Sequence, residues 1–357
     1  MGSTQVVGRT SIVSKVSYRI GIRYINFCLK WKVYNGKIKI VIFVINTYLF
    51  LEAQIVADDD DTALDAGADV GPVNLWMHSL FSDVSVSLNE NLVSPPTSLY
   101  PYRAYIEILL SYGPAAIESQ LTGVTWYKDT PGHQDKRTTD NKGFTSRKAL
   151  TAQSKYVQMT GILHLDLFYQ EKYLLNHVDL KIKLRRSRDV FALMVDADNY
   201  KIKIKDLALF VRNVQLSPAV RMGHVKAFEK TSCKYPIRRV EVKVDTVPRG
   251  NMNYVQDNMF LGQLPKRLVI GCVDSDTLNG TITKIPFDFK HYKINFVALN
   301  VDDDRFPPNH YNPTLKTQVI FAVIWGSMLI RERCIKTKEI PSPERNTLKE
   351  TPYLDPI

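Results

Sequence analysis

The chain has 357 residues, which is long enough to bury one large hydrophobic core or two moderate ones. Hydrophobic residues make up 45% and charged residues 23%, as in an ordinary globular protein. The four cysteines stand far apart without a Cys-x-x-Cys pair, which argues against a disulfide scaffold or a zinc ribbon and for a reducing compartment. The 15 Phe and 18 Tyr, with frequent Val, Ile and Thr, favour strands.

The positive charge lies mainly at the start of the chain. Residues 1–46 hold eight Lys or Arg and no acid, whereas the other 311 residues hold 39 basic and 36 acidic side chains. We predict a basic N-terminal arm over residues 1–46, and such an arm can make weak contact with nucleic acid or touch a membrane surface. The alternative is a leader without a function. The apolar residues 40–51 are too few to cross a bilayer, so no membrane span is predicted.

The next part of the chain predicts strands with one short helix. Residues 47–57 indicate a strand, and the four acids 58–61 a solvated loop. A calcium site is the alternative reading of these acids, but the spaced ligands and glycine of a calcium loop are absent. Residues 80–89 alternate between apolar and polar, as in a strand with one buried face, and Asn89 to Asn91 predicts a turn into a return strand.

Helical spacing follows this hairpin. Apolar residues recur at Tyr105, Ile108, Leu109 and Tyr112, and Gly113 with Pro114 predicts where the helix ends. Residues 130–155 are polar and contain Pro and Gly, which predicts a long exposed loop.

Three further strands are predicted after the loop, because apolar and polar residues alternate there. They cover residues 157–170, 178–186 and 200–214. The outward side chains of the second one, Lys181 to Arg188, form a basic face. Such a face can line a nucleic-acid surface, and a solvated or intersubunit strand face is the alternative.

The second half of the body begins near residue 226. Strands are predicted at residues 240–244, 268–273 and 287–299, and Asn279-Gly280 is a hairpin signal. Residues 302–304 read as another loop tip. A 12-residue apolar run at 319–330 is again too short for a membrane span, and the polar, proline-rich end predicts a loose tail over residues 331–357. Many short strands with turn signals are typical of an all-β sandwich or barrel.

Several segments resemble the double-jelly-roll major capsid proteins of Polinton/Maverick elements and adintoviruses, over about residues 47–310. They are GPVNLWMHSLFS (71–82), LNENLVSP (88–95), YPYRAY (100–105), QLTGVTWYKD (120–129), GILHLDLFYQ (161–170) and LLNHVD (174–179).

The resemblance implies two fused antiparallel β-sandwiches, with the short helix in the first. The first jelly roll would cover residues 47–225, and the second, at 226–330, would be truncated and lack strands that family members carry. It implies a structural protein that forms homotrimers and a capsid lattice, with a minor capsid protein as a further partner, or a decayed genome-integrated copy. The expected location is a virion or the nucleus and cytoplasm of a host cell, without secretion. Residues expected to maintain the fold are Asn74, Leu80, Phe81, Pro101, Tyr102, Arg103, Gly262 and Pro265.

Two other function classes remain open. His164 and Asp166 would share one face of a strand and could supply two ligands of an iron triad in a jelly-roll oxygenase, with His224 or His291 as the third. A polar sheet face is the simpler reading. A glycan-binding or attachment module is the other alternative, with Trp76 and Trp126 as stacking platforms or as core residues. No nucleophile motif or phosphate-binding loop is present. We therefore predict no enzyme activity, no small-molecule substrate, and no catalytic, cofactor or metal site.

Overall fold

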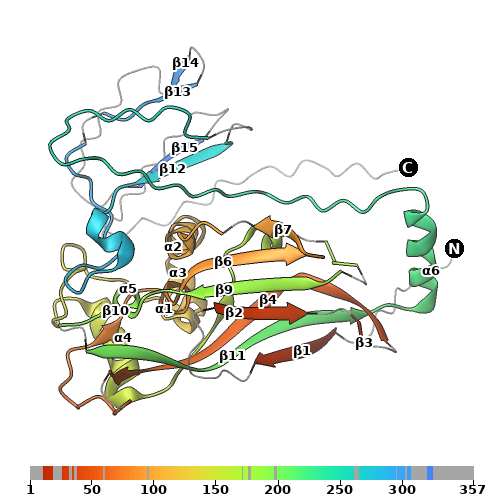
Figure 1. Cartoon of the computed structure of the whole chain (residues 1–357), viewed down its shortest axis with the longest axis horizontal. Coiled ribbons are helices and arrows are strands. Elements are labelled where there is room, and N and C mark those ends of the chain that lie inside the picture. Colours follow the sequence, from red (N-terminus) through yellow and green to blue (C-terminus); the bar gives the residue numbers. More distant parts are fainter. Residues whose placement is uncertain are drawn as a thin grey trace, which may run out of the picture. The chain divides into compact units, whose positions relative to one another are not determined.

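The computed structural model describes most of the chain. The described residues are 11–18, 26–31, 34–35, 38–58, 61–94, 96–170, 172–175, 178–196, 199–260, 265–294, 296–301, 304–306 and 320–324. The chain forms two compact units, of which the first takes residues 1–255 and 273–288 and the second residues 256–272 and 289–357 (Figure 1). Gly262, which the sequence analysis counted among the fold residues, lies outside the described residues.

A five-stranded antiparallel sheet is the larger of the two main sheets of the first unit. Its strands are β1 (Ser11–Tyr18), β11 (Tyr200–Gln215), β4 (Ile38–Ala57), β3 (Tyr34–Asn35) and β8 (Val157–Ile162). β4 lies in the middle and pairs with both β11 and β8. Alternate residues of β4, from Leu49 to Ile55, are fully buried, as the period of two requires for a strand with one face in the core.

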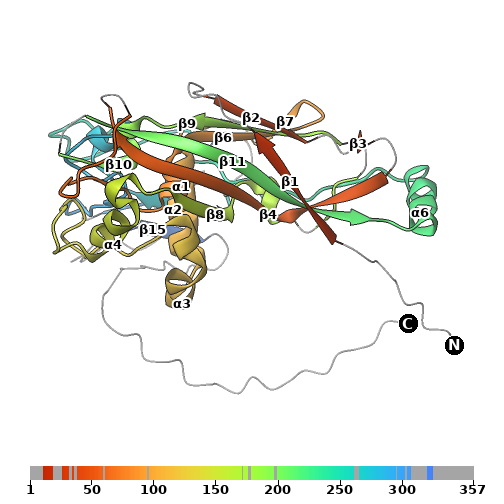
Figure 2. The ribbon, with the colours of Figure 1, turned by 90° about the horizontal axis from the view of Figure 1, so that it is seen from below.

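The other main sheet has four antiparallel strands. They are β2 (Asn26–Trp31), β9 (Leu180–Arg186), β6 (Phe81–Leu88) and β7 (Asn91–Ser94). The turn between β6 and β7 consists of Asn89 and Glu90, both with positive φ, which confirms the predicted turn and return strand. Leu180, Ile182 and Leu184 of β9 are buried as predicted. Figure 2 shows the two sheets as separate layers.

The strands of these two sheets pair in a nested order. β1 pairs with β11, β2 with β9, β4 with β8, and β6 with β7. Counting only the eight strands β1, β2, β4, β6, β7, β8, β9 and β11, the first pairs with the last, the second with the next to last, and so on inward. The two-residue pairs β3–β4 and β5–β10 stand outside this order. Because β1, β2, β3 and the first residues of β4 precede residue 47, the predicted basic arm contributes strands to both sheets and does not stand outside them.

Short helices lie between β5 and β8. The first of them are α1 (Trp76–Ser79), α2 (Tyr100–Ser111), α3 (Pro114–Glu118) and the 3-10 helix η1 (Gln120–Val124). The predicted helix is thus confirmed and starts at Tyr100. Pro101 lies in its first turn, where the N–H that proline lacks would have no partner within the helix. Trp76 and Trp126 are both buried, so they serve as core residues and not as exposed stacking platforms.

The prediction of a long exposed loop at residues 130–155 is wrong in part. The segment contains α4 (Lys142–Thr151) and η2 (Ala152–Ser154). Asn141 caps α4 by accepting a hydrogen bond from the Phe144 N–H, and Phe144 and Arg147 are fully buried. The composition resembles that of a loop because, apart from Phe144 and Gly143, the buried residues of this segment are polar: Asn141, Arg147 and Thr151.

The strand predicted over residues 157–170 ends early. β8 stops at Ile162, and residues Asp166–Tyr169 form the 3-10 helix η3. Downstream, α5 (Asp189–Ala192) leads into β10 (Leu193–Met194), which pairs with β5 (Gly71–Pro72). The strands predicted at residues 178–186 and 200–214 are confirmed as β9 and β11.

After β11 the chain forms α6 (Pro218–Phe228) and then an extended segment at residues 229–255, which we call the strap. The alternating Val240, Val242 and Val244 predicted a strand here. The strap does not pair with any described strand, so this prediction is wrong. Alternation creates the propensity for a strand, but a strand also needs a neighbouring edge to receive its backbone hydrogen bonds.

The Asn279-Gly280 hairpin is also absent. These residues end the 3-10 helix η4 (Ser275–Asn279), and Gly280 has φ 84° beside Phe191. A Cβ at Gly280 would lie 2.6 Å from the Phe191 backbone nitrogen, so the glycine serves a close approach to α5.

The described strands of the second unit form two antiparallel pairs. β12 (Arg267–Gly271) pairs with β15 (Ile320–Ile324), and β13 (Leu299–Val301) pairs with β14 (Asp304–Phe306). β12 confirms the strand predicted at 268–273. The strand expected across 287–299 is wrong, since its described residues are irregular until Leu299. The loop tip at residues 302–304 and the apolar run at 319–330 lie partly outside the described residues.

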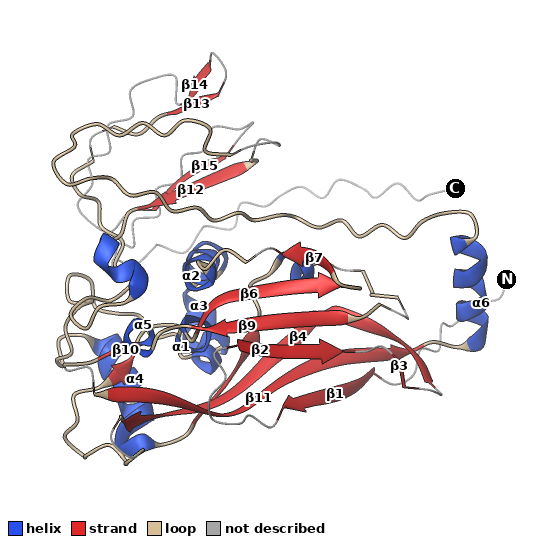
Figure 3. Cartoon of the chain, in the orientation of Figure 1, coloured by secondary structure: helices blue, strands red, loops and turns tan. Residues whose placement is uncertain are grey.

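The fold is therefore largely antiparallel β-sheet with several short helices (Figure 3). Most of the residues expected to maintain it are buried: Asn74, Leu80, Phe81, Pro101, Tyr102 and Arg103. Pro265 is half-buried. No helix in the described part of the chain has the length and hydrophobicity that crossing a bilayer requires.

Candidate functional site: a buried ionic cluster under the strap

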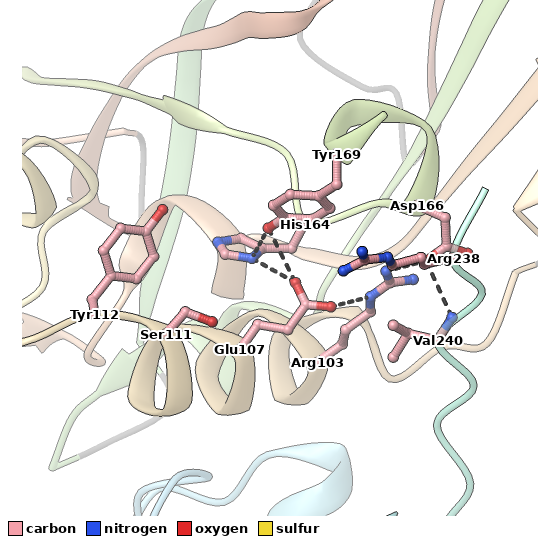
Figure 4. A pocket seen from close by; sticks show the side chains of 9 residues that line it. All are labelled: Arg103, Glu107, Ser111, Tyr112, His164, Asp166, Tyr169, Arg238 and Val240. Carbon is pink, nitrogen blue, oxygen red and sulfur yellow. Dashed lines mark hydrogen bonds and ion pairs between the residues drawn. The ribbon is translucent and has the colours of Figure 1, made fainter. Parts of the chain in front are cut away.

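A pocket of about 200 Å³ lies in the first unit where α2, the β8–η3 connection and the strap meet (Figure 4). The residues that line it are Arg103, Glu107, Ser111, Tyr112, His164, Asp166, Tyr169, Arg238 and Val240. α2 places Arg103 and Glu107 one turn apart on the same side, because residues four apart are neighbours on a helix surface. The site therefore gathers charged groups from three parts of the chain.

Arg103 is the centre of the cluster. Its side chain is 8% exposed, and its Nε donates a hydrogen bond to Glu107 Oε1 at 2.9 Å. Its Nη2 donates to Asp166 Oδ1 at 2.5 Å. Two carboxylates thus share one buried guanidinium, and buried ion pairs need complete hydrogen bonding to be tolerated.

His164 connects the cluster to the core. Its Nδ1 lies 2.8 Å from Glu107 Oε2 and 2.8 Å from the Tyr169 hydroxyl (Figure 4). The His164 backbone N–H donates to the Tyr100 hydroxyl at 3.3 Å, and that hydroxyl also lies 2.8 Å from Nδ1 of the buried His78. Glu107 therefore joins a hydrogen-bonded chain that reaches from the pocket to α1.

The strap is bonded to the rest of the first unit at this cluster. The Val240 backbone N–H donates to Asp166 Oδ1 at 3.2 Å, on the oxygen that Arg103 also contacts. Nearby, the Leu175 N–H donates to the Tyr235 hydroxyl at 3.2 Å, and Lys172 Nζ donates to the carbonyl of Lys234 at 3.1 Å. Asp166 therefore contacts both the central arginine of the cluster and the backbone of the strap.

Burial and charge shift the pKa values here in different directions. Burial, and next the neighbouring His164, lower the pKa of His78 well below its usual range, so His78 is neutral at neutral pH. Burial acts to raise the pKa of Glu107, but the hydrogen bond to His164 and the charge of Arg103 outweigh it, and the net pKa is lowered. Burial raises the pKa of Asp166, and Arg103 offsets only part of that shift.

The structure does not bring His164 and Asp166 together as the sequence analysis expected for a metal triad. They do not share a strand face, because β8 ends before them. The Nδ1 of His164 faces Glu107 and Tyr169, and Asp166 faces Arg103 and the strap. His224 lies on α6, and His291 belongs to the second unit. Among the described residues, no three His, Cys, Asp or Glu side chains gather where they could hold a metal ion.

A second buried polar cluster, around Arg147 and Asn141, was not predicted from the sequence. Arg147 is fully buried and donates to the carbonyls of Pro72 and Tyr127 and to Asp129 Oδ1, at 2.8 to 3.0 Å. Asn141 Nδ2 donates to the carbonyls of Gln134 and Lys136. The signal that could have found them is the Asn cap followed by Phe144 and Arg147 at helical spacing.

The other polar features have ordinary surroundings. Asp58 and Asp61 pair with Lys201 at 3.1 to 3.4 Å, which agrees with a solvated loop more than with a calcium site. On the basic face of β9, Lys183 and Arg185 are exposed, whereas Arg186 pairs with Asp189 of α5. Cys233 and Cys272 are both free thiols.

Changing Glu107 to Gln is expected to lower the free energy of unfolding by about 1–3 kcal/mol near neutral pH, because it weakens bonds to Arg103 and His164. Folding lowers the pKa of Glu107, so the ionised carboxylate stabilises the folded state. This stabilisation is fully present above the ordinary pKa of a glutamate and is lost as the pH falls through the lowered pKa. The gap between wild type and variant should therefore shrink in acid. Urea unfolding near pH 7 and at a pH well below the ordinary range of a glutamate carboxyl measures it. The exposed Glu118→Gln on α3 is the control, and an equal gap at both pH values would contradict the assignment.

No protein-family model matches the chain. The chain is 26% identical over 248 residues to the uncharacterized protein F54H12.2 of Caenorhabditis elegans. The match covers 68% of this chain and 57% of that protein, so the chain spans a little over half the length of the relative.

Proposed function

We propose that this chain is a structural protein of the double-jelly-roll major capsid type, related to those of Polinton/Maverick elements. In this proposal the first unit is a jelly roll, and the second unit contributes strands of another sandwich. Copies of the chain associate as trimers that tile a shell. The function would consist of packing against other copies, without chemical catalysis.

The nested strand pairing is the observation that supports this proposal most directly. A jelly roll is a long hairpin rolled into two sheets, so its first strand meets its last and its second meets its next to last. The pairs β1–β11, β2–β9, β4–β8 and β6–β7 have that order. The buried cluster supports it further, because the bonds of Arg103, His164 and Asp166 hold elements of the fold together.

The proposal is tested by the assembly state of the full chain. Light scattering after size-exclusion chromatography should give a mass that rises with concentration to a trimer, and electron microscopy should show pseudo-hexagonal particles or shells. Circular dichroism and cooperative unfolding establish that the sample is folded. A folded chain that stays monomeric at the highest attainable concentration would overturn the proposal. Stoichiometric iron or manganese in the purified protein would favour an enzyme instead.

A further inference from the structure

β9 carries a row of three cations on the outer face of its sheet. Lys181, Lys183 and Arg185 alternate along the strand with three buried aliphatic residues. Lys183 and Arg185 are exposed, and Lys181 is half-buried. Because alternate residues of a strand lie about 7 Å apart on one face, the row is about 14 Å long. β9 lies between β2 and β6, so a strand flanks the row on each side (Figure 1).

The strands beside this row supply little negative charge. β2 and β9 together contain five basic residues and no acid. Lys30 of β2 is in register with Lys181, and like charges in such positions destabilise a sheet. On the other side, the β6 residues in register with the row are two serines and one acid, Asp83. Asp83 is buried, and its Oδ1 accepts a hydrogen bond from the Thr97 N–H at 3.3 Å. The sheet therefore gathers positive charge here with a single acid beside it.

β11 shows how this protein neutralises a similar row elsewhere. Lys201, Lys203 and Lys205 likewise occupy three alternate positions of a strand. Each of them forms an ion pair, at 3.1 to 3.4 Å, with an acid of β4 or of the loop that follows β4. In the part of the chain that the structure describes, the three cations of β9 form no ion pair. The two strands thus share a pattern of cations, and only the row on β9 is open to an outside anion.

A row of cations without acid partners is complementary to a line of negative charges. The backbone of a nucleic acid has that form, since every nucleotide carries a phosphate, and lysine and arginine side chains are common donors to phosphate oxygens. The outward positions of the row hold only cations. They offer no aromatic ring on which a base could stack and no apolar side chain that could enter a bilayer. These features favour contact with phosphates over contact with bases or lipid tails.

We infer that Lys181, Lys183 and Arg185 bind the phosphate backbone of nucleic acid without reading its sequence. This inference goes beyond the proposed function and does not rest on it, because one copy of the chain carries the complete row. Each phosphate that a cation neutralises releases counterions, so the binding constant falls as salt is added. Three such contacts contribute a slope of about −3 to a plot of log binding constant against log salt concentration for duplex DNA, and about −2 for a single strand.

The contribution of the row is measured by fluorescence anisotropy with a labelled DNA duplex, between about 50 and 200 mM salt. In the β9 triple variant, Lys181→Gln/Lys183→Gln/Arg185→Gln, binding at the lowest salt concentration should weaken roughly tenfold or more, and the slope should become shallower by about 3. The control is the β11 triple variant, Lys201→Gln/Lys203→Gln/Lys205→Gln, which changes the net charge equally and should keep the wild-type slope. Circular dichroism establishes that all three proteins are folded alike. Equal weakening in both variants would overturn the inference, because net charge alone would then explain the binding.

The place of contact is tested on the wild-type chain by acetylation of its lysines and mass spectrometry. Excess duplex should slow the acetylation of Lys183 several-fold, and that of the half-buried Lys181 in the same direction. Lys203 and Lys205 are the internal controls and should react at the same rate with and without DNA. Duplexes of equal length and different sequence should protect equally. Protection of the β11 lysines but not of Lys183, or a strong preference for one sequence, would contradict backbone binding at this row.

Other polyanions decide whether the row recognises the phosphates of a nucleic acid. Single-stranded RNA, vesicles that contain phosphatidylserine, and polyglutamate are compared with the duplex in the same assay. Nucleic acid should bind at the lowest concentration, and the β9 triple variant should lose that binding. A wild type that binds neither duplex nor single strand at about 50 mM salt would overturn the inference, and so would tighter binding of vesicles or polyglutamate. The proposed function is unaffected by these results, because the assembly state tests it separately.

Discussion

Replacing Arg147 with Ala is expected to lower the free energy of unfolding by about 3–5 kcal/mol, the largest effect of any single change considered for this chain. Arg147 is fully buried, and its guanidinium makes bonds in three directions, to Pro72, Tyr127 and Asp129. The variant leaves two carbonyls and the Asp129 carboxylate without these donors and opens a cavity under α4. Buried groups that lose their partners carry the full cost of their lost hydration.

Urea unfolding followed by circular dichroism measures this effect, and Lys142→Ala provides the control on the same helix. Lys142 is exposed, so its variant should differ from the wild type by less than about 0.5 kcal/mol. Arg147→Lys should also be strongly destabilising, because one ammonium cannot reach the three directions that a planar guanidinium serves. An Arg147→Ala protein within about 1 kcal/mol of the wild type would show that these bonds do not hold the 128–151 region in place.

Replacing Arg103 with Ala is expected to cost about 3 kcal/mol and to release the strap. The variant leaves Glu107 and Asp166 side by side without their shared cation. Asp166, whose pKa burial already raises, then takes up a proton more readily and becomes a weaker acceptor for the Val240 N–H. The cluster therefore loses stability and its attachment to the strap together.

Limited trypsin digestion detects the release, because Arg238, Arg239 and Lys243 lie in the strap. Cleavage at these sites should become several times faster in Arg103→Ala than in the wild type, at a temperature where both proteins stay folded. Lys183→Ala on β9 is the control, since Lys183 is exposed and its loss should leave the strap cleavage rate unchanged. If Arg103→Ala loses stability but its strap is not cleaved faster, the cluster does not hold the strap in place.

Local periodicity predicted the elements whose burial is regular along the chain. β6, β9, β11 and α2 have apolar residues at strand or helix spacing, and a hairpin such as β6–β7 needs only neighbouring residues. α4 was missed because its interior is held by Asn141 and Arg147, which composition assigns to the surface. The alternation from Val240 to Val244 gave a wrong strand prediction, because a strand also requires the edge of a neighbouring strand, about which local alternation carries no information.

The candidate site could be predicted only in part. The spacing of His164 and Asp166 singled out two members of the cluster, but it assumed a strand that ends at Ile162. Their partners come from α2 and from the strap, more than 50 residues away in each direction. Only the folded chain brings such residues together, so no local pattern could have shown that the pair belongs to an ionic cluster.

The pairing of β4 with β11 determines when this protein can fold. At their nearest pair, Ala57 and Tyr200, the two strands are separated by 143 positions in the sequence. At 5–20 residues per second, a ribosome takes roughly 7–30 s to cover that distance. During that time the edge of β4 that later pairs with β11 stays open, although β8 can already cover the other edge. We therefore expect newly made chains to depend on chaperones, and to aggregate when translation stalls between the two strands.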